Sequence, residues 1–234
     1  MSNHPVVSEQ VWISARKELL AREKEISRLC DDLAKLRREL PWVKVTKPYI
    51  FKGPDGQQSL SDLFFNRSQL IVYHFMFDPD WTEGCPICSF WADNYDRSHI
   101  HLAHRDATLV TISRAPYEKI KDYQQRLGWT FPWFSSEDSD FNFDFQVSIS
   151  PEQVKSGNAE YNYQKTKMSG ELPGISVFFR DETGDVFHTY SAYSRGLDML
   201  NGTYHFMDLL PKGRDEEGLP WTMAWVRRHD QYED

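Results

Sequence analysis

The chain has 234 residues, with 27 Lys and Arg against 35 Asp and Glu, a net charge of -8 and a pI near 5.5. This acidic balance argues against a nucleic-acid-binding protein, because such proteins need positive charge to neutralise phosphates. The N-terminus lacks the pattern of a signal peptide and no segment offers 18 uncharged apolar residues, so we expect a cytoplasmic protein without a membrane partner.

Residues 1–47 are expected to form a helical arm. Between residues 8 and 40, apolar side chains recur at alternating spacings of three and four, with Ser8 as the expected N-cap and Pro41 as the terminator. The 29 residues from Trp12 to Leu40 span roughly 43 Å as a helix, which exceeds the width of a small domain. We therefore predict that it meets a second copy in a homodimer. The alternative is an arm that lies across its own domain.

The next feature is an apolar run at residues 70–77, followed by a Cys-Pro-Ile-Cys motif at residues 85–88. The run is typical of a buried strand, and a turn separates it from a helix expected at residues 86–104. Unpaired backbone N–H groups and the positive end of the helix dipole favour a thiolate at Cys85. Cys88 lies one helical turn further on, from where it can close a disulfide with Cys85.

A zinc half-site and a pair of inert buried thiols are the alternatives to a redox dithiol. A zinc site needs a second pair of ligands, whereas the third cysteine, Cys30, lies in the N-terminal segment. His101 and His104 share a helix face, without His99, and no carboxylate or thiol at ligand spacing completes a set. Since cytosolic cysteines rarely form structural disulfides, we predict a cycling dithiol without a metal or other cofactor.

Strands and helices alternate after the motif. We expect a strand at residues 107–113, a helix at 116–127 and a strand at 129–134. Alternation with short connections predicts a parallel βαβ sheet. Residues 135–171 form an irregular insertion, which is either a lid or substrate wall or a packing loop. Within it, residues 141–147 are compatible with an edge strand or with a short helix.

The C-terminal part is expected to contain a hairpin, a helix and a packed tail. Residues 175–180 and 185–191 flank a turn and predict two antiparallel strands. A final helix is expected at residues 195–210. The tail, residues 212–234, contains apolar side chains, so we expect it to pack on the domain formed by residues 48–211. Four tail residues are candidates for a salt-bridge cluster or an anion site: Arg227, Arg228, His229 and Asp230.

This order of elements resembles the thioredoxin superfold, and the strand after the second helix is similar to the peroxiredoxin branch. The runs FDPDWTEGCPICSFWAD, GWTFPWFSSEDSDFNFDFQVS and AWVRRHDQY resemble a widespread family of thioredoxin-like proteins of unknown function. Its members are often labelled predicted dithiol-disulfide isomerases. The resemblance implies an α/β thioredoxin-like fold of the peroxiredoxin-like variant, with a long N-terminal helix and a C-terminal extension.

The resemblance also implies roles for particular residues. Cys85 matches the attacking thiol and Cys88 the resolving thiol of a thiol-disulfide oxidoreductase. Pro173 matches the proline whose cis peptide bond faces the dithiol. The implied partners are protein or small-molecule disulfides. The acid–base carboxylate of the strand before the motif has no counterpart here, and His74 is the ionisable residue at the end of that strand.

A peroxiredoxin-like thiol peroxidase that acts on peroxides is the second hypothesis. Peroxiredoxins carry P-x-x-x-T-x-x-C, and Pro79, Thr82 and Cys85 form a motif one residue shorter. Thr82 would donate a hydrogen bond to a peroxide oxygen, and Arg114 or Arg105 would stabilise the thiolate. A third hypothesis is a non-enzymatic, dimeric interaction protein with a dormant or redox-sensing dithiol, which the arm and the tail suggest.

Overall fold

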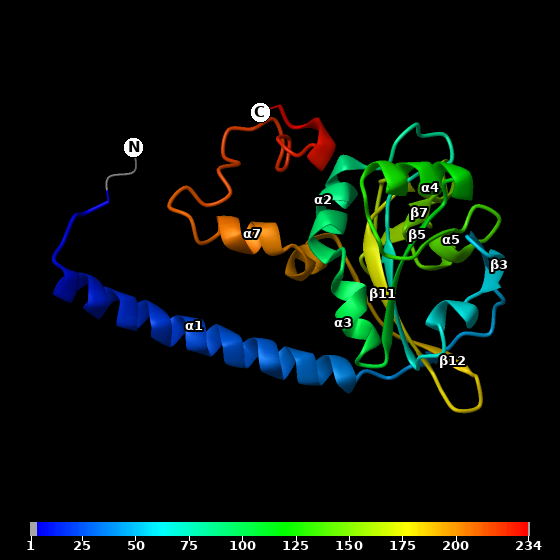
Figure 1. The fold of residues 1–234 in the computed structure, drawn as a ribbon, viewed down its shortest axis with the longest axis horizontal. Helices are drawn as coiled ribbons and strands as arrows, with labels where there is room; N and C mark the ends of the chain where they lie inside the picture. The colour runs from blue at the N-terminus through cyan, green and yellow to red at the C-terminus, as the bar shows by residue number, and fades with distance from the viewer. Residues whose placement is uncertain (1–3, 234) are drawn as a thin grey trace. The chain divides into compact units, whose positions relative to one another are not determined.

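The computed structural model describes residues 4–233 of the chain, which separates into two compact units, Met1–Pro41 and Trp42–Asp234 (Figure 1). The boundary between the two units follows Pro41, whereas the sequence predicted that the arm ends at residue 47. The reason is that β1 (Val43–Lys44) pairs with β12 (Val186–Tyr193) and so belongs to the second unit.

The first unit consists mainly of helix α1 (Glu9–Arg38), which begins where the Ser8 side chain accepts a hydrogen bond from the Val11 N–H at 3.4 Å. None of the residues of α1 is buried. Its apolar stripe is exposed and includes Trp12, Leu19, Ile26, Leu29, Leu33 and Leu36. In the described part of the chain, no helix is both long and apolar enough to cross a membrane.

The second unit is built on an eight-stranded sheet of order β1-β12-β11-β4-β5-β6-β2-β3. The remaining strands of this sheet are β2 (Ile50–Gly53), β3 (Gly56–Ser59), β4 (Gln69–His74), β5 (Ala107–Ser113), β6 (Trp133–Ser135) and β11 (Gly174–Arg180). Strands β4, β5 and β6 are parallel, while β11 and β12 form the predicted antiparallel hairpin and β11 pairs with β4. The central strand therefore has a parallel neighbour on one side and an antiparallel neighbour on the other.

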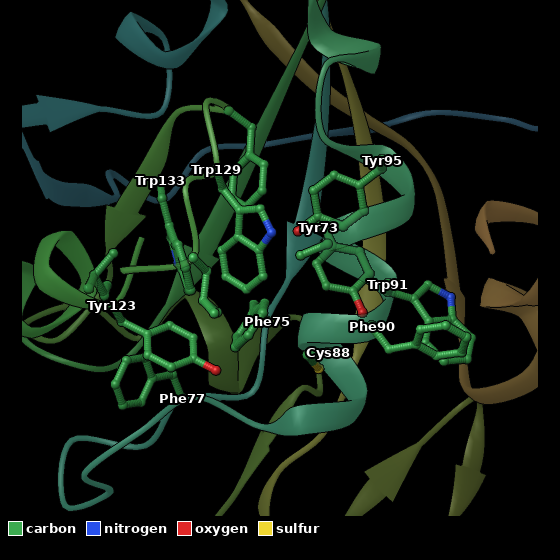
Figure 2. Close-up of a cluster of buried hydrophobic side chains, with 14 of the residues drawn as sticks. Tyr73, Phe75, Phe77, Cys88, Phe90, Trp91, Tyr95, Tyr123, Trp129 and Trp133 are labelled. Carbon is green, nitrogen blue, oxygen red and sulfur yellow. The ribbon is translucent and has the colours of Figure 1, made fainter. Parts of the chain in front are cut away.

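Each face of the sheet has its own hydrophobic core. Helices α2 (Pro86–Tyr95) and α4 (Tyr117–Arg126) supply side chains to the first core, which is rich in aromatic rings (Figure 2). The second core includes residues of the short helices η1 (Asp62–Phe64) and α5 (Phe141–Asp144). Because side chains alternate along a strand, β4 sends Tyr73 into the first core and its neighbour Val72 into the second.

The motif Cys-Pro-Ile-Cys lies at the start of α2. A loop joins it to residues 75–77, which extend the central strand β4 and continue its pairing with the chain of β5. The order β4-α2-β5-α4-β6 forms the parallel half of the sheet, and the β11–β12 hairpin completes it (Figure 1). This is the α/β thioredoxin-like fold that the element order predicted, with the long N-terminal helix, and that prediction is confirmed.

Two long helices predicted from the sequence are wrong, because each is interrupted. The helix expected at residues 86–104 is divided into α2 and α3 (Ser98–Ala103), since Arg97 adopts a left-handed conformation with φ of 72°. The helix expected at residues 195–210 is divided into the 3₁₀ helix η2 (Ser194–Leu200) and α7 (Gly202–Met207). There the Asn201 side chain accepts a hydrogen bond from the Tyr204 N–H at 3.1 Å and caps a new helix.

Residues 141–147 of the insertion, for which the sequence allowed an edge strand or a short helix, contain a short helix. This helix is α5, and the strand expected at residues 129–134 is confined to β6. The remaining small elements of the insertion are β7 (Ser148–Ile149), α6 (Pro151–Lys155), β8 (Glu160–Tyr161), β9 (Gln164–Lys165) and β10 (Gly170–Glu171). Strand β10 pairs with β7, which ties the C-terminal end of the insertion to its interior.

Candidate functional site

The two thiols of the motif lie in different surroundings. Cys85 is the N-cap of α2 and is partly exposed, with Pro86 in the first helical turn, where a missing N–H costs nothing. Its backbone N–H donates to the Met76 carbonyl at 3.0 Å, which fixes the loop to the extension of β4. Cys88 is fully buried in the first core (Figure 2), and its sulfur accepts a hydrogen bond from the Met76 N–H at 3.4 Å.

These surroundings move the two pKa values in opposite directions. The Cys88 side chain donates a hydrogen bond to the Cys85 sulfur and, with the N–H groups of Cys88 and Ile87 and the charge of Arg228, lowers the pKa of Cys85 to about 7, against the effect of burial. Burial, and then the hydrogen bond with Cys85, raise the pKa of Cys88. Cys85 is therefore the thiol of the pair that ionises first as the pH rises.

The residue before the motif, Gly84, has no room for a side chain. A Cβ there would lie 2.7 Å from the Phe75 ring and 2.8 Å from the Tyr123 ring. The Tyr123 hydroxyl lies 2.8 Å from Ser89 Oγ, which donates to the Cys85 carbonyl at 2.9 Å. Glycine thus allows the loop to reach α2 and brings the Tyr123 hydroxyl into contact with the first turn of the helix.

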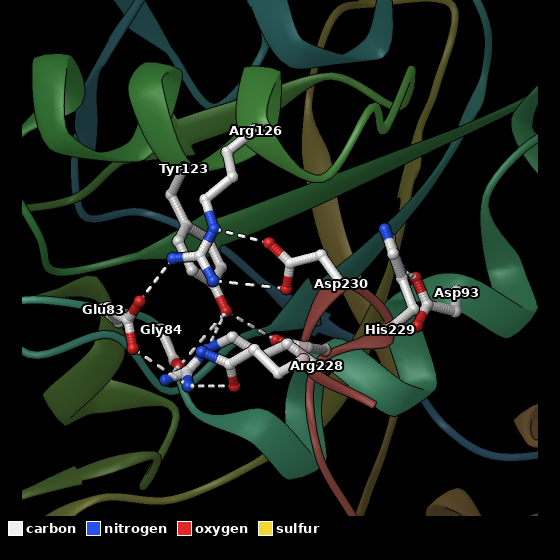
Figure 3. A network of polar contacts seen from close by, with 10 residues as sticks. Glu83, Gly84, Asp93, Tyr123, Arg126, Arg228, His229 and Asp230 are labelled. Carbon is white, nitrogen blue, oxygen red and sulfur yellow. Dashed lines mark hydrogen bonds and ion pairs between the residues drawn. The ribbon is translucent and has the colours of Figure 1, made fainter. Parts of the chain in front are cut away.

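The C-terminal segment contacts the same loop through Arg228 (Figure 3). The Arg228 guanidinium donates to the Gly84 carbonyl at 2.6 Å and to the Tyr123 hydroxyl at 2.7 Å, and it forms an ion pair with Glu83 at 2.9 Å. Only 13% of its side chain is exposed. A residue that lies 144 positions away in the sequence is therefore part of the surroundings of the dithiol.

Neighbouring tail residues also pair with the body of the domain. His229 contacts Asp93 of α2 at 2.7 Å, and Asp230 forms an ion pair with Arg126 of α4 at 2.7 Å (Figure 3). His229 and Asp230 therefore attach the tail to α2 and α4. Arg227 differs, because it donates to the carbonyl oxygens of Ala224 and Val226 within the tail. The buried side chain of Val226 adds apolar contact with the first core.

A cavity of about 200 Å³ reaches the buried thiol. Its walls come from β4, α2, the residue before β11, η2 and the tail: Tyr73, Ile87, Cys88, Trp91, Pro173, Ser194, Arg195, Leu197, Asp198 and Met223. The structure thus brings Cys88 and Pro173 to one cavity. The implied cis bond at Pro173 is wrong, because all peptide bonds among the described residues are trans. The Pro173 carbonyl instead accepts a hydrogen bond from the Tyr161 hydroxyl at 2.7 Å.

His74 does not serve the dithiol, because it points to the opposite face of the sheet from Tyr73. It lies 2.9 Å from Ser176 Oγ and stacks on the Phe145 ring, which also packs on Phe141 and Phe178 of the second core. Burial lowers the pKa of His74 to about 3, so the imidazole is neutral at physiological pH. The register of β4, which the sequence left open, thus separates this residue from the thiols.

The remaining sequence candidates are either exposed or paired with other residues. Thr82 is exposed in the loop before Gly84. Arg114 forms an ion pair with the buried carboxylate of Glu171 at 2.9 Å, and Arg105 is exposed after α3. Within residues 4–233, no group of three or more His, Cys, Asp or Glu side chains is arranged to hold a metal ion.

Sequence reasoning missed three contributors to this site. Arg228 was a candidate for an ion pair or an anion site, but nothing in its spacing connects it with the dithiol. Tyr123 lies in the helix expected at residues 116–127 and Met223 in the tail expected to pack on the domain, but no pattern placed either beside the thiols. The sequence does carry one signal, the density of apolar residues in the tail. It predicts that the tail packs on the domain, but it does not predict where.

Comparison with known proteins identifies a family and a set of distant structures. The family model described as "Bacterial protein of unknown function (DUF899)" matches residues 1–232. No curated protein matches the chain.

The matching solved structures include three bacterial peroxiredoxins. A PrxQ mutant from Xylella fastidiosa is 15% identical with a TM-score of 0.43, covering 69% of this chain and 89% of that one. Peroxidoxin BcpB from Mycobacterium tuberculosis is 15% identical with a TM-score of 0.47, covering 70% and 95%. Peroxiredoxin Q from Xanthomonas campestris is 13% identical with a TM-score of 0.46, covering 66% and 85%. At these TM-scores and identities, no residue role is transferred to this chain.

Proposed function

Since this chain belongs to the DUF899 family of bacterial proteins, whose description assigns no activity, we propose a function from the site itself: a thiol-disulfide oxidoreductase with Cys85 as its nucleophile. The observation that supports it best is the position of the two thiols, with Cys85 partly exposed at the N-cap of α2 and Cys88 buried one helical turn further on. A partly exposed thiolate beside a buried thiol suits two consecutive exchange reactions.

The chemistry begins with the reduced protein. The Cys85 thiolate attacks one sulfur of a substrate disulfide, forms a mixed disulfide and releases the other sulfur as a thiolate, which takes up a proton. Cys88 then loses its proton and attacks the Cys85 sulfur, which releases the second substrate thiol and leaves a Cys85–Cys88 disulfide. The substrate disulfide gains two electrons, and two external thiol groups must then reduce the Cys85–Cys88 disulfide and become a disulfide themselves. We assign Pro173, in the cavity wall beside Cys88, to substrate contact.

The test of this function compares two oxidants with the reduced wild-type protein at pH 7. The interchain disulfides of insulin serve as a model protein disulfide. We expect them to react about ten-fold faster with the reduced protein than with free cysteine, because a larger fraction of Cys85 is thiolate. Hydrogen peroxide is expected to gain no more than the same roughly ten-fold over free cysteine, which the larger thiolate fraction alone supplies. Stopped-flow tryptophan fluorescence follows oxidation, and mass spectrometry identifies the product on Cys85.

The same experiment separates the other two hypotheses. Fast conversion of Cys85 to a sulfenic acid by hydrogen peroxide, with slow disulfide exchange, would establish the peroxidase instead. In that case Thr82→Val should slow the reaction, because the hydroxyl would no longer donate to the peroxide oxygen. If neither oxidant outpaces free cysteine, both enzymatic hypotheses are wrong and an interaction protein with a dormant dithiol takes their place.

We also propose that the protein forms a homodimer through α1. The helix has 30 residues and none is buried, and its exposed stripe contains Leu29 and Leu33. An apolar stripe with heptad-like spacing is covered when two helices pack together. The double substitution Leu29→Glu with Leu33→Glu is expected to give a monomer in light scattering coupled to size-exclusion chromatography.

The control for this prediction is Arg28→Glu, which changes the net charge by the same amount outside the apolar stripe. It is expected to remain dimeric. A wild-type protein that is monomeric at tens of micromolar, or a double variant that stays dimeric, would contradict an interface on this helix.

A further inference from the structure

We propose that Arg228, supplied by the C-terminal segment, is a positioning residue of the dithiol centre: it fixes the loop that carries Cys85 and holds a positive charge beside that sulfur. This proposal rests on the proposed function of Cys85 as a nucleophile. The tail thereby completes a site whose Cys-Pro-Ile-Cys motif lies at residues 85–88.

The first argument is the geometry of the guanidinium. Its donors reach the Gly84 carbonyl at 2.6 Å and the Tyr123 hydroxyl at 2.7 Å, and a third nitrogen pairs with Glu83 at 2.9 Å (Figure 3). Arginine is suited to such a role, because its planar fork holds several acceptors at once and keeps its charge. The two residues before Cys85 are thus held by one side chain of the tail.

The second argument is that Arg228 is itself fixed. Its guanidinium lies 5.8 Å from the centre of the Tyr123 ring, and 13% of its side chain is exposed. The next residues are tied to the domain by the His229–Asp93 and Asp230–Arg126 contacts. A partly desolvated charge in a fixed position acts more strongly on a nearby thiolate than a mobile surface charge does.

The third argument concerns the charges around Cys85. The acidic residue of this network that is closest to Cys85 in sequence is Glu83. It forms ion pairs with both Arg228 and Arg126. The other ionisable neighbours are Cys88 on α2, Tyr73 on β4, Tyr123 on α4 and Asp230 in the tail. The charge of Arg228 lowers the pKa of Cys85, in the same direction as the Cys88 hydrogen bond. Removing Arg228 disfavours the Cys85 thiolate in two ways. A positive charge is lost, and the negative charge of Glu83 is less well compensated.

The experiment measures the pH at which Cys85 is half ionised, in a Cys30→Ser background. The rate of iodoacetamide addition is followed from pH 5 to 9, and the adduct on Cys85 is identified by peptide mass spectrometry. Arg228→Met is expected to raise the midpoint by about one pH unit. Arg228→Lys, which keeps the charge but not the fork, is expected to lie between Arg228→Met and the wild type. Arg227→Met is the matched control and should not shift the midpoint.

A second variant separates the charge from the mere clamping of the loop. Glu83→Gln removes the counter-charge and is expected to lower the midpoint, since Arg228 then acts on the thiolate without compensation. If Arg228 only clamps the loop, Arg228→Met and Glu83→Gln will shift the midpoint in the same direction, and the proposal is wrong. If Arg228→Met does not fold, as judged by circular dichroism, Glu83→Gln decides: a midpoint that fails to fall overturns the proposal.

The readout also distinguishes this proposal from the proposed function. Alkylation by iodoacetamide reports the ionisation of Cys85 whether or not the protein exchanges disulfides. Opposite shifts in the two variants without disulfide exchange would keep Arg228 as the positioning residue and refute the oxidoreductase. Fast exchange with an unchanged midpoint in Arg228→Met would do the reverse.

Discussion

Cys85→Ser is expected to abolish disulfide exchange, lowering its rate at pH 7 by roughly 10³-fold or more, because a serine hydroxyl does not ionise in this range. Cys88→Ser is expected to stop one step later and to accumulate a mixed disulfide on Cys85. Serine at position 88 can still donate a hydrogen bond to the Cys85 sulfur, so the attacking thiolate is retained. Non-reducing electrophoresis and intact mass spectrometry with a peptide disulfide detect the trapped species.

The exposed third thiol provides the control for these variants. Cys30→Ser should exchange disulfides at the wild-type rate, because Cys30 lies on α1, outside the unit that holds the motif. A Cys85→Ser protein that still reacts while Cys88→Ser is inactive would reverse the two roles. That result would direct attention to the cavity that reaches the Cys88 sulfur, since a small substrate would then enter there.

The elements that could be predicted from the sequence are those fixed by local patterns. Helix α1, the strands β4 and β5, helix α4 and the β11–β12 hairpin each follow from spacing of apolar residues or from turn residues. The motif Cys-Pro-Ile-Cys also places its thiols without tertiary information, because the N-cap and the first turn are local features of a helix.

The errors arise where a single residue changes the backbone. Arg97 carries no signal for its left-handed conformation, so the helix seemed to continue to residue 104. Asn201 is an ordinary polar residue until its side chain caps α7. The cis bond at Pro173 was implied by the resemblance alone, whereas the chain has the trans form that is the commoner one for bonds to proline. Apolar periodicity alone does not determine any of these conformations.

The part of the site that the sequence did not reveal is formed by long-range contacts. Arg228 meets Gly84 across 144 residues, and no local pattern encodes such a pairing. His74 shows the same limit within one strand, since a shift of one residue in register would have turned it toward the thiols. The nucleophile can therefore be predicted from a motif, whereas the groups that adjust its pKa require the folded chain.

Gly84→Ala is expected to destabilise the fold by about 1–3 kcal/mol and to slow disulfide exchange. The backbone of Gly84 does not require glycine by its φ angle, so the cost comes from the contacts at 2.7 Å and 2.8 Å that a Cβ makes with the Phe75 and Tyr123 rings. Neither ring can withdraw easily, because Phe75 also packs on Trp133 with ring centres 4.6 Å apart. Urea unfolding measures the stability, and the insulin assay measures the exchange.

The matched control is Gly202→Ala at the start of α7, where a Cβ meets only Asn94 Oδ1 at 3.5 Å, an ordinary contact. That variant should keep wild-type stability within about 0.5 kcal/mol. If Gly84→Ala is equally stable, the rings must move apart at little cost. The Cys85 loop then has more freedom than its contacts suggest. Loss of exchange without loss of stability would instead show that the added methyl group displaces Cys85 while the core adapts.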